Sequence, residues 1–134
     1  MGAWGSQVFE NDGAMDFAAG VADGGGLAAL EECLDQVIKV GDDYLDSSIA
    51  EEALMAAEIV ARLMERPGAQ SSYFQEIDAW IGRQRTKPAP ALVDKARRAV
   101  ERILGDQSEI VELWQDSDSF ESWKADVEGI RARL

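Results

Sequence analysis

The sequence predicts an all-α fold, a single compact domain of six or seven helices spanning residues 1–134. In several segments apolar residues recur at three- and four-residue spacing, which is the pattern of one face of an amphipathic helix. No segment shows the sustained two-residue alternation that is typical of a half-buried strand. With 134 residues, 46% of them hydrophobic, the chain is long enough to bury a core.

Two helices are predicted in the first third of the chain. Asn11 or Asp12 is suited to cap the first, because either side chain accepts hydrogen bonds from the unpaired N–H groups of a first helical turn. The three glycines at positions 24–26 should break this helix. The second helix should end at Gly41. Its apolar face comprises Leu27, Leu30, Leu34, Val37 and Ile38.

A third helix is predicted to begin at Ser47 or Ser48 and to run to Arg66, just before Pro67-Gly68. Nearly all of its residues from position 53 to 64 are apolar or small. The polar residues follow a thin strip, comprising Glu51, Glu58, Arg62 and Glu65. A helix with so narrow a polar strip should lie at the centre of the fold, with only that strip in water.

Four further helices are predicted in the second half. Their expected starts are Ser71 or Ser72, Pro90, Asp106 with Glu109 as a capping pair, and Ser117 or Ser119. The last helix carries an apolar stripe from Phe120 to Leu134. This stripe either packs in the core or remains exposed for a second copy of the chain, which would form a homo-oligomer.

An internal similarity appears at an offset of 40 residues. The pattern Ala-x-x-Ile-Val-x-Arg-Leu-Met at 56–64 matches Ala-x-x-Ala-Val-x-Arg-Ile-Leu at 96–104. A shorter helix containing Glu-Ile and a tryptophan is expected after each. The match indicates two stacked helical hairpins around the central helix. Chance similarity between two amphipathic helices is the alternative.

The chain contains no histidine and a single cysteine, Cys33. The absence of histidine excludes Ser-His-Asp and Cys-His catalysis and nearly all familiar zinc and iron sites. Cys33 lies on an apolar helix face, where a packed thiol is more common than a reactive one. These observations favour a protein that is not an enzyme and that uses no cofactor.

The net charge of −13 is unevenly distributed. Residues 1–66 contain 14 acidic and 3 basic residues, whereas residues 67–134 contain 12 acidic and 10 basic ones. The bases between Arg83 and Arg102 should lie on a solvated helix face or pair with the acidic half. Such a charge disfavours nucleic acid and anionic membranes as partners. A weaker alternative is contact with nucleic acid through Arg97, Arg98 and Arg102.

The leading functional hypothesis is recognition of a partner protein with a basic surface. An adaptor or an antitoxin-like or immunity-like protein would work in this way. The expected binding residues are Asp42, Asp43, Asp46, Glu51 and Glu52. No stretch approaches the roughly 18 apolar residues of a membrane span, and the first 26 residues contain no Lys or Arg to open a secretory signal. A cytoplasmic location is therefore expected.

The alternative hypothesis is a divalent-metal site built from carboxylates, since Ca²⁺ and Mg²⁺ prefer oxygen ligands. Its candidate ligands are Asp12, Asp16, Asp42, Asp43 and Asp46. The spacing of the Gly41–Asp46 segment differs from that of the helix–loop–helix calcium loop. A solvated loop that caps the third helix would explain the same carboxylates.

The first 17 residues resemble the opening of a family of small, mostly bacterial proteins of unknown function. The similarity comprises M-G-A-W-G at 1–5, F-E-N-D at 9–12 and D-F at 16–17. The resemblance implies a bacterial, intracellular, helical protein and supplies no activity. The motif positions are Trp4, Phe9, Asn11, Asp12 and Asp16. Trp4 and Phe9 would anchor the chain end while Asn11 or Asp12 caps a helix; a polar site built from Asn11, Asp12 and Asp16 is the alternative.

Overall fold

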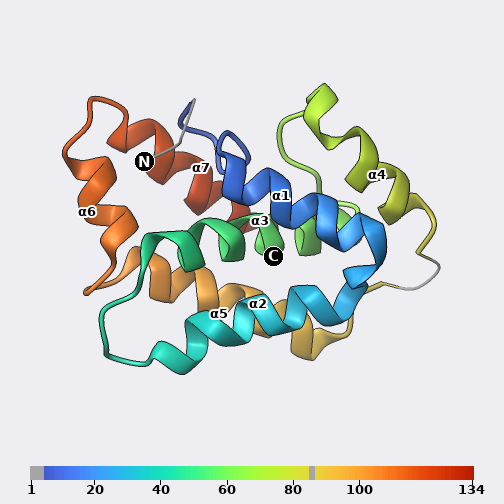
Figure 1. The fold of residues 1–134 in the computed structure, drawn as a ribbon, viewed down its shortest axis with the longest axis horizontal. Helices are drawn as coiled ribbons and strands as arrows, with labels where there is room; N and C mark the ends of the chain where they lie inside the picture. The colour runs from blue at the N-terminus through green and yellow to red at the C-terminus, as the bar shows by residue number, and fades with distance from the viewer. Residues whose placement is uncertain (1–4, 85–86) are drawn as a thin grey trace.

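A computed structural model describes residues 5–84 and 87–134, and the described chain is helical (Figure 1). It contains no strand in these ranges, and Leu45 forms an isolated bridge with Ser108. The predicted all-α fold is therefore confirmed. The α-helices are α1 (Asp12–Gly20), α2 (Gly26–Val40), α3 (Ser47–Leu63), α4 (Gln75–Gly82), α5 (Pro90–Leu104), α6 (Glu109–Gln115) and α7 (Phe120–Arg133). A π-helical turn, η1 (Val21–Gly25), and a 3-10 turn, η2 (Ser72–Phe74), complete the set.

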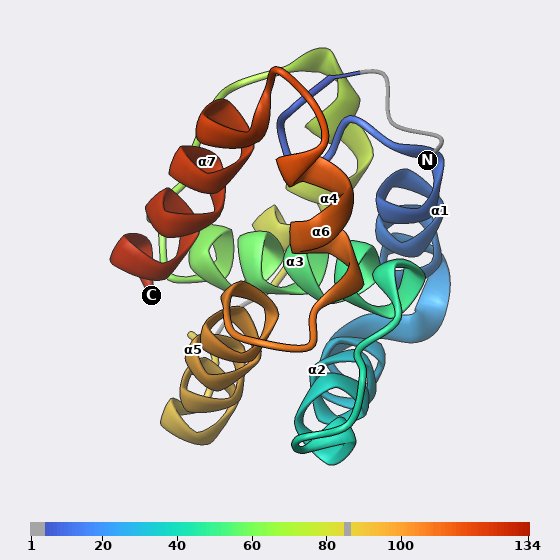
Figure 2. The same cartoon turned by 90° about the vertical axis from the view of Figure 1, so that its left-hand side faces the viewer.

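Helix α3 is the centre of the fold, as the sequence predicted. It packs against α1, α2, α4, α5, α6 and α7, and Figures 1 and 2 show these helices around it. Ala50 and every residue from 53 to 63 are buried. Small side chains at Ala53, Ala56 and Ala57 allow the neighbouring helices to approach α3 closely.

The prediction that the polar strip of α3 lies in water is wrong at its middle. Glu58 is only 4% exposed and Arg62 only 5% exposed. They form an ion pair, with 3.1 Å between Arg62 Nε and Glu58 Oε2. Arg133 on α7 and Asp78 on α4 then pair with Glu58 and Arg62 respectively. Because the charges are compensated, α7 and α4 can cover this part of the strip.

The three glycines at 24–26 form a tight joint between α1 and α2. The chain passes through η1 and enters α2 directly at Gly26. Gly24 has φ +129° and Gly26 has φ +60°, a region that residues with a side chain rarely adopt. Helix α1 ends earlier, at Gly20, and the predicted break lies at Asp23 and Gly24, with no separate linker before α2. Gly41, also at φ +60°, ends α2 at the predicted position.

The structure settles some predicted helix ends and corrects others. Asn11 caps α1, because its Oδ1 accepts a hydrogen bond from Ala14 N at 2.7 Å. Helix α3 begins at Ser47, one of the two predicted starts, and Asp46 in the preceding loop caps it. It ends at Leu63 instead of Arg66, because Glu65 adopts φ +63° and turns the chain away.

The predicted capping pair at the start of α6 is also wrong. Ser108 occupies the cap position, and no side chain forms the cap hydrogen bond. Glu109 instead accepts a hydrogen bond from Ser47 N at 2.8 Å. Its carboxylate therefore satisfies an unpaired N–H group in the first turn of α3, a helix that is distant in the sequence. The other predicted starts are found as Ser71 before η2, Pro90 at the first position of α5 and Ser119 before α7.

The apolar stripe of the last helix packs inside the fold. Trp123 is 2% exposed, and Val127 and Ile130 are fully buried. The Trp123 ring stacks on Trp114 of α6 with 6.0 Å between centroids. This stripe is therefore not left for a second subunit. The helices of the internal similarity, α3 and α5, pack against each other, while α4 packs on α3 and α6 on both.

Candidate functional site

Three of the predicted binding residues, Asp42, Asp43 and Asp46, are exposed in the loop between α2 and α3. This loop is paired with the loop between α5 and α6. Leu45 N donates to Gln107 O at 2.8 Å, and Glu109 N donates to Leu45 O at 3.0 Å. Two backbone hydrogen bonds thus fix the acidic loop against a segment about 60 residues away in the sequence.

Arg102, at the end of α5, holds both loops together. Its guanidinium donates to four backbone carbonyls, two in each loop. The acceptors in the acidic loop are Gly41 O, at 2.7 Å, and Asp43 O, at 2.5 Å. Those in the second loop are Asp106 O, at 2.8 Å, and Gln107 O, at 3.3 Å. Arg102, a weaker candidate for nucleic-acid contact, is thus a clamp within the chain.

An aromatic side chain stands at the middle of this acidic loop. Tyr44 is 51% exposed, and its hydroxyl donates to Glu112 Oε1 on α6 at 3.1 Å. The pKa of Tyr44 is raised, first by partial desolvation and then by this hydrogen bond. The negative charges of Glu112, Glu109 and Asp46 add to the effect. We name the exposed Tyr44 ring with these carboxylates and those of Asp42 and Asp43 the Tyr44 platform.

Three members of this surface were not predicted from the sequence: Tyr44, Glu109 and Glu112. A tyrosine among aspartates in a polar loop was the available signal for Tyr44. Glu109 and Glu112 had no local signal, because the loop pairing alone brings them close to the tyrosine.

The predicted binding residues Asp46, Glu51 and Glu52 have different environments. The hydroxyl and backbone N–H of Ser48 donate to Asp46 and hold the pKa of that carboxyl below its usual value. Burial raises the pKa of Glu51 and of Glu52, which are both half-buried. Glu51 lies against α1 and Glu52 is close enough to Cys33 of α2 to affect its pKa. The five residues therefore form two groups instead of one surface.

The candidate metal ligands lie on two separate elements. Asp12 and Asp16 are exposed on α1, whereas Asp42, Asp43 and Asp46 belong to the loop before α3. In residues 5–84 and 87–134, no group of three or more Cys, Asp or Glu side chains is placed so that it could hold a metal ion. No observation in the described chain therefore favours the metal hypothesis.

The motif positions near the N-terminus differ in their surroundings. Trp4 lies outside the described residues. Phe9 is buried and packs edge-on against Phe74, with 4.7 Å between ring centroids. Asn11 uses both ends of its amide within the chain, since it caps α1 and its Nδ2 donates to Val8 O at 3.1 Å. Asp12 and Asp16 are exposed. Phe9 and Asn11 therefore anchor the start of α1.

Residues 2–126 match a family described as a domain of unknown function, DUF4259. The chain belongs to this family. The resemblance of the opening residues likewise indicated a family of unknown function. Comparison with curated proteins and with solved structures gives no significant match. The DUF4259 match supplies no activity, so any function must be inferred from the geometry.

The net negative charge of this DUF4259 chain is concentrated on one side of the molecule. Residues 12–46 contain nine acids and one base, Lys39. They form α1, η1, α2 and the following loop, and Figure 2 shows α1 and α2 opposite α5 and α7. We call this the acidic side. Its exposed carboxylates are Asp12, Asp16, Asp23, Glu31, Glu32, Asp42, Asp43 and Asp46.

Part of the basic segment in α5 pairs with the acidic half, which was one of the two expectations for it. Lys95 Nζ lies 3.0 Å from Asp35 and 3.4 Å from Glu31. Arg98 pairs with Asp94 on its own helix at 3.5 Å. The two Lys95 contacts fasten α5 to α2, and most carboxylates of the acidic side have no such ion pair among the described residues.

The single cysteine has the character of a core residue. Cys33 is 7% exposed, and burial, reinforced by the charges of Glu52 and Glu32, raises the pKa of its thiol to about 12. The thiol is therefore protonated at neutral pH, and this agrees with the packed role expected for it. In the described chain no helix has both the length and the apolar character that a membrane span requires.

Proposed function

We propose that this DUF4259 protein is a non-enzymatic binding protein that recognises a basic surface on a partner protein. The Tyr44 platform is the observation that carries the proposal. The partner would be neutralised or recruited by contact alone, as by an antitoxin, an immunity protein or an adaptor.

The chemistry of the platform suits the side chains of arginine and lysine. A guanidinium or ammonium group is attracted to the face of a tyrosine ring. Carboxylates at the rim would accept hydrogen bonds from the same cation. Tyrosine is also among the residues that dominate binding energy at protein interfaces. Tyr44, surrounded by Asp46, Glu109 and Glu112, combines all three features.

The Arg102 clamp supports the proposal because it holds the platform in place before any partner arrives. A loop that is already ordered loses little conformational freedom on binding. Two of the four carbonyls that accept hydrogen bonds from Arg102 belong to Gly41 and Asp43, in the loop that carries Tyr44. The acidic side would add long-range attraction, which mainly accelerates association and weakens with salt.

A capture experiment with charge-matched variants tests the proposal. Purified protein is incubated with a lysate of its own source, and bound proteins are eluted with increasing salt. The test variant is Asp42→Lys/Asp43→Lys. The control is Glu121→Lys/Glu128→Lys on α7, which changes the net charge equally on the other side of the molecule. A third variant, Tyr44→Ala, removes the ring.

The proposal predicts one basic partner, captured by the wild type and by the control and released by salt. The Asp42→Lys/Asp43→Lys variant should lose it, and Tyr44→Ala should bind it at least about tenfold more weakly. Equal capture by all variants, or equal loss from both double variants, would contradict a role for this loop.

A further inference from the structure

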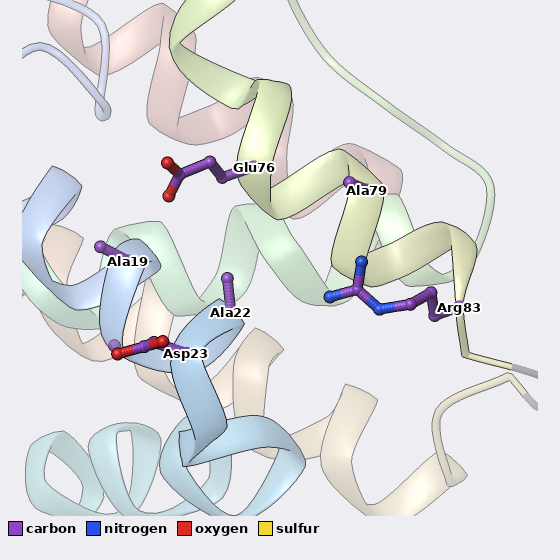
Figure 3. Close-up of a pocket in the computed structure, with 7 residues that line it drawn as sticks. Ala19, Ala22, Asp23, Glu76, Ala79 and Arg83 are labelled. Carbon is purple, nitrogen blue, oxygen red and sulfur yellow. The ribbon is translucent and has the colours of Figure 1, made fainter.

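A pocket of about 550 Å³ lies between α4 on one side and the end of α1 with η1 on the other. Figure 3 shows this pocket and its lining. Four residues of its wall have no side-chain atom beyond Cβ, and these are Ala19, Gly20, Ala22 and Ala79. Their small size leaves the hollow open. Its volume falls in the range of roughly 300–1,000 Å³ that is usual for small-molecule sites.

Three charged side chains of both signs line this pocket: Asp23, Glu76 and Arg83. Figure 3 shows the carboxylates of Asp23 and Glu76 toward one end and the guanidinium of Arg83 toward the other, with Ala22 between them. None of the three forms a hydrogen bond or ion pair with another side chain in residues 5–84 and 87–134. Opposite charges thus share one hollow without pairing.

We propose that this pocket binds a small zwitterion with an ammonium group and a carboxylate, such as a free amino acid. The ammonium would lie between Asp23 and Glu76, since its three N–H groups can serve both carboxylates. The ligand's carboxylate would pair with Arg83, whose planar guanidinium matches a carboxylate with two parallel hydrogen bonds.

The charges of the pocket exclude simpler ligands. A purely anionic molecule would meet two carboxylates at one end, and a purely cationic one would meet Arg83 at the other. A neutral apolar molecule would leave all three groups without a partner and partly desolvated. A ligand that carries both signs satisfies each group.

This site is independent of the proposed partner binding. The pocket borders η1, which precedes α2, whereas the Tyr44 platform belongs to the loop that follows α2. The two therefore lie at opposite ends of a 15-residue helix (Figure 1). Either function would survive the loss of the other.

The test is a titration of the full chain, followed by amide chemical shifts, with amino acids of increasing length. The probes are glycine, β-alanine, 4-aminobutyrate and 6-aminohexanoate, with methylammonium and acetate as half-probes. The proposal predicts that one length fits best, with a Kd of about 1 mM. It should bind at least about tenfold more tightly than either half-probe, with shifts concentrated in η1 and α4.

Variants that each remove one charge distinguish a specific binding site from general attraction of ions. Arg83→Gln and Glu76→Gln should each weaken binding of the best probe about tenfold. Arg131→Gln, an exposed change on α7, should leave binding unchanged. All three residues are exposed, so the variants should fold, and circular dichroism checks this. The proposal is overturned if no zwitterion binds more tightly than the half-probes, or if Arg83→Gln binds as well as the wild type.

Discussion

At the scale of single residues, Glu58 is a buried carboxylate that two arginines share. Its carboxylate accepts hydrogen bonds from Arg62 Nε at 3.1 Å and from Arg133 Nη2 at 2.7 Å. The Arg62 guanidinium also lies 3.7 Å from the centroid of the Phe74 ring and donates to Ala69 O at 2.6 Å. One carboxylate thus connects α3 to α7 and, through Arg62, to the segment before α4.

Replacing Glu58 with Gln should destabilise the protein strongly. The change keeps the shape of the side chain but leaves two guanidinium groups without their shared anion. Breaking a buried ion pair from one side costs about 3–5 kcal/mol. Urea denaturation at pH 7 would measure the loss in the free energy of unfolding.

The matched control is Glu128→Gln on α7. Glu128 pairs with Lys124 at the surface, at 4.0 Å, and both side chains are nearly half exposed. An exposed pair of this kind contributes about 0–1 kcal/mol. Similar losses in the free energy of unfolding for the two variants would mean that the Glu58 ion pairs contribute no more than a solvent-exposed pair.

Replacing Asp126 with Asn should stabilise the protein at neutral pH. Burial raises the pKa of Asp126, although its Oδ2 accepts a hydrogen bond from Val8 N at 2.8 Å. A carboxyl with a raised folded-state pKa contributes stability below its unfolded pKa and loses that contribution as the pH rises through the folded pKa. Asn carries no charge and keeps an oxygen for Val8.

The pH dependence distinguishes this effect from a change in packing. Unfolding curves in urea should show the Asn variant more stable than the wild type at pH 7. The difference should disappear near pH 3, where the wild-type carboxyl is largely protonated (unfolded Asp has a pKa of about 3.9). A gain of the same size at both pH values would refute the proposed role of the charge.

At the scale of elements, the pairing of two loops by Arg102 depends on the geometry of the guanidinium. Its fixed fork reaches carbonyls in both loops, whereas the ammonium of lysine is a single point of charge with three donors. The consequence is that the loops before α3 and before α6 behave as one unit.

Arg102→Lys should loosen both loops together, even though it keeps the charge. Hydrogen bonds from charged donors contribute about 1.5–3 kcal/mol each, so losing part of the fork should speed local opening by at least about tenfold. Hydrogen exchange at the amides of Leu45 and Glu109 measures this opening. Arg98→Lys on the same helix should leave both amides unchanged, and faster exchange in only one loop would contradict the joint behaviour.

Helix ends were predictable where the signal is local, and less so where a distant residue contributes. Gly41 and Pro90 end and begin their helices as expected, because a positive φ and a missing N–H are properties of the residue itself. The start of α3 at Ser47 was likewise predicted, whereas its end was placed three residues too late. Glu109 was assigned to its own helix, whereas its partner, Ser47, is 62 residues away.

At the scale of the whole molecule, the fold class and the central position of α3 could be predicted from periodicity, because the apolar spacing of a helix is a local pattern in the sequence. The burial of the polar strip of α3 could not be predicted from periodicity, because the residue that covers Glu58 lies 75 positions later in the chain. The Tyr44 platform was only half predictable for the same reason. Its aspartates lie in one short loop of the sequence, whereas Glu109 and Glu112 are brought to that loop by the fold.

The separation of charge between the acidic side and the remainder of the molecule affects how the protein rotates before it contacts a partner. It gives the protein an electric dipole moment in addition to its net charge of −13. In the field of a positively charged body, that dipole produces a torque, which biases rotational diffusion so that α1 and α2 turn toward the body. A collision is then more often one in which the correct face leads.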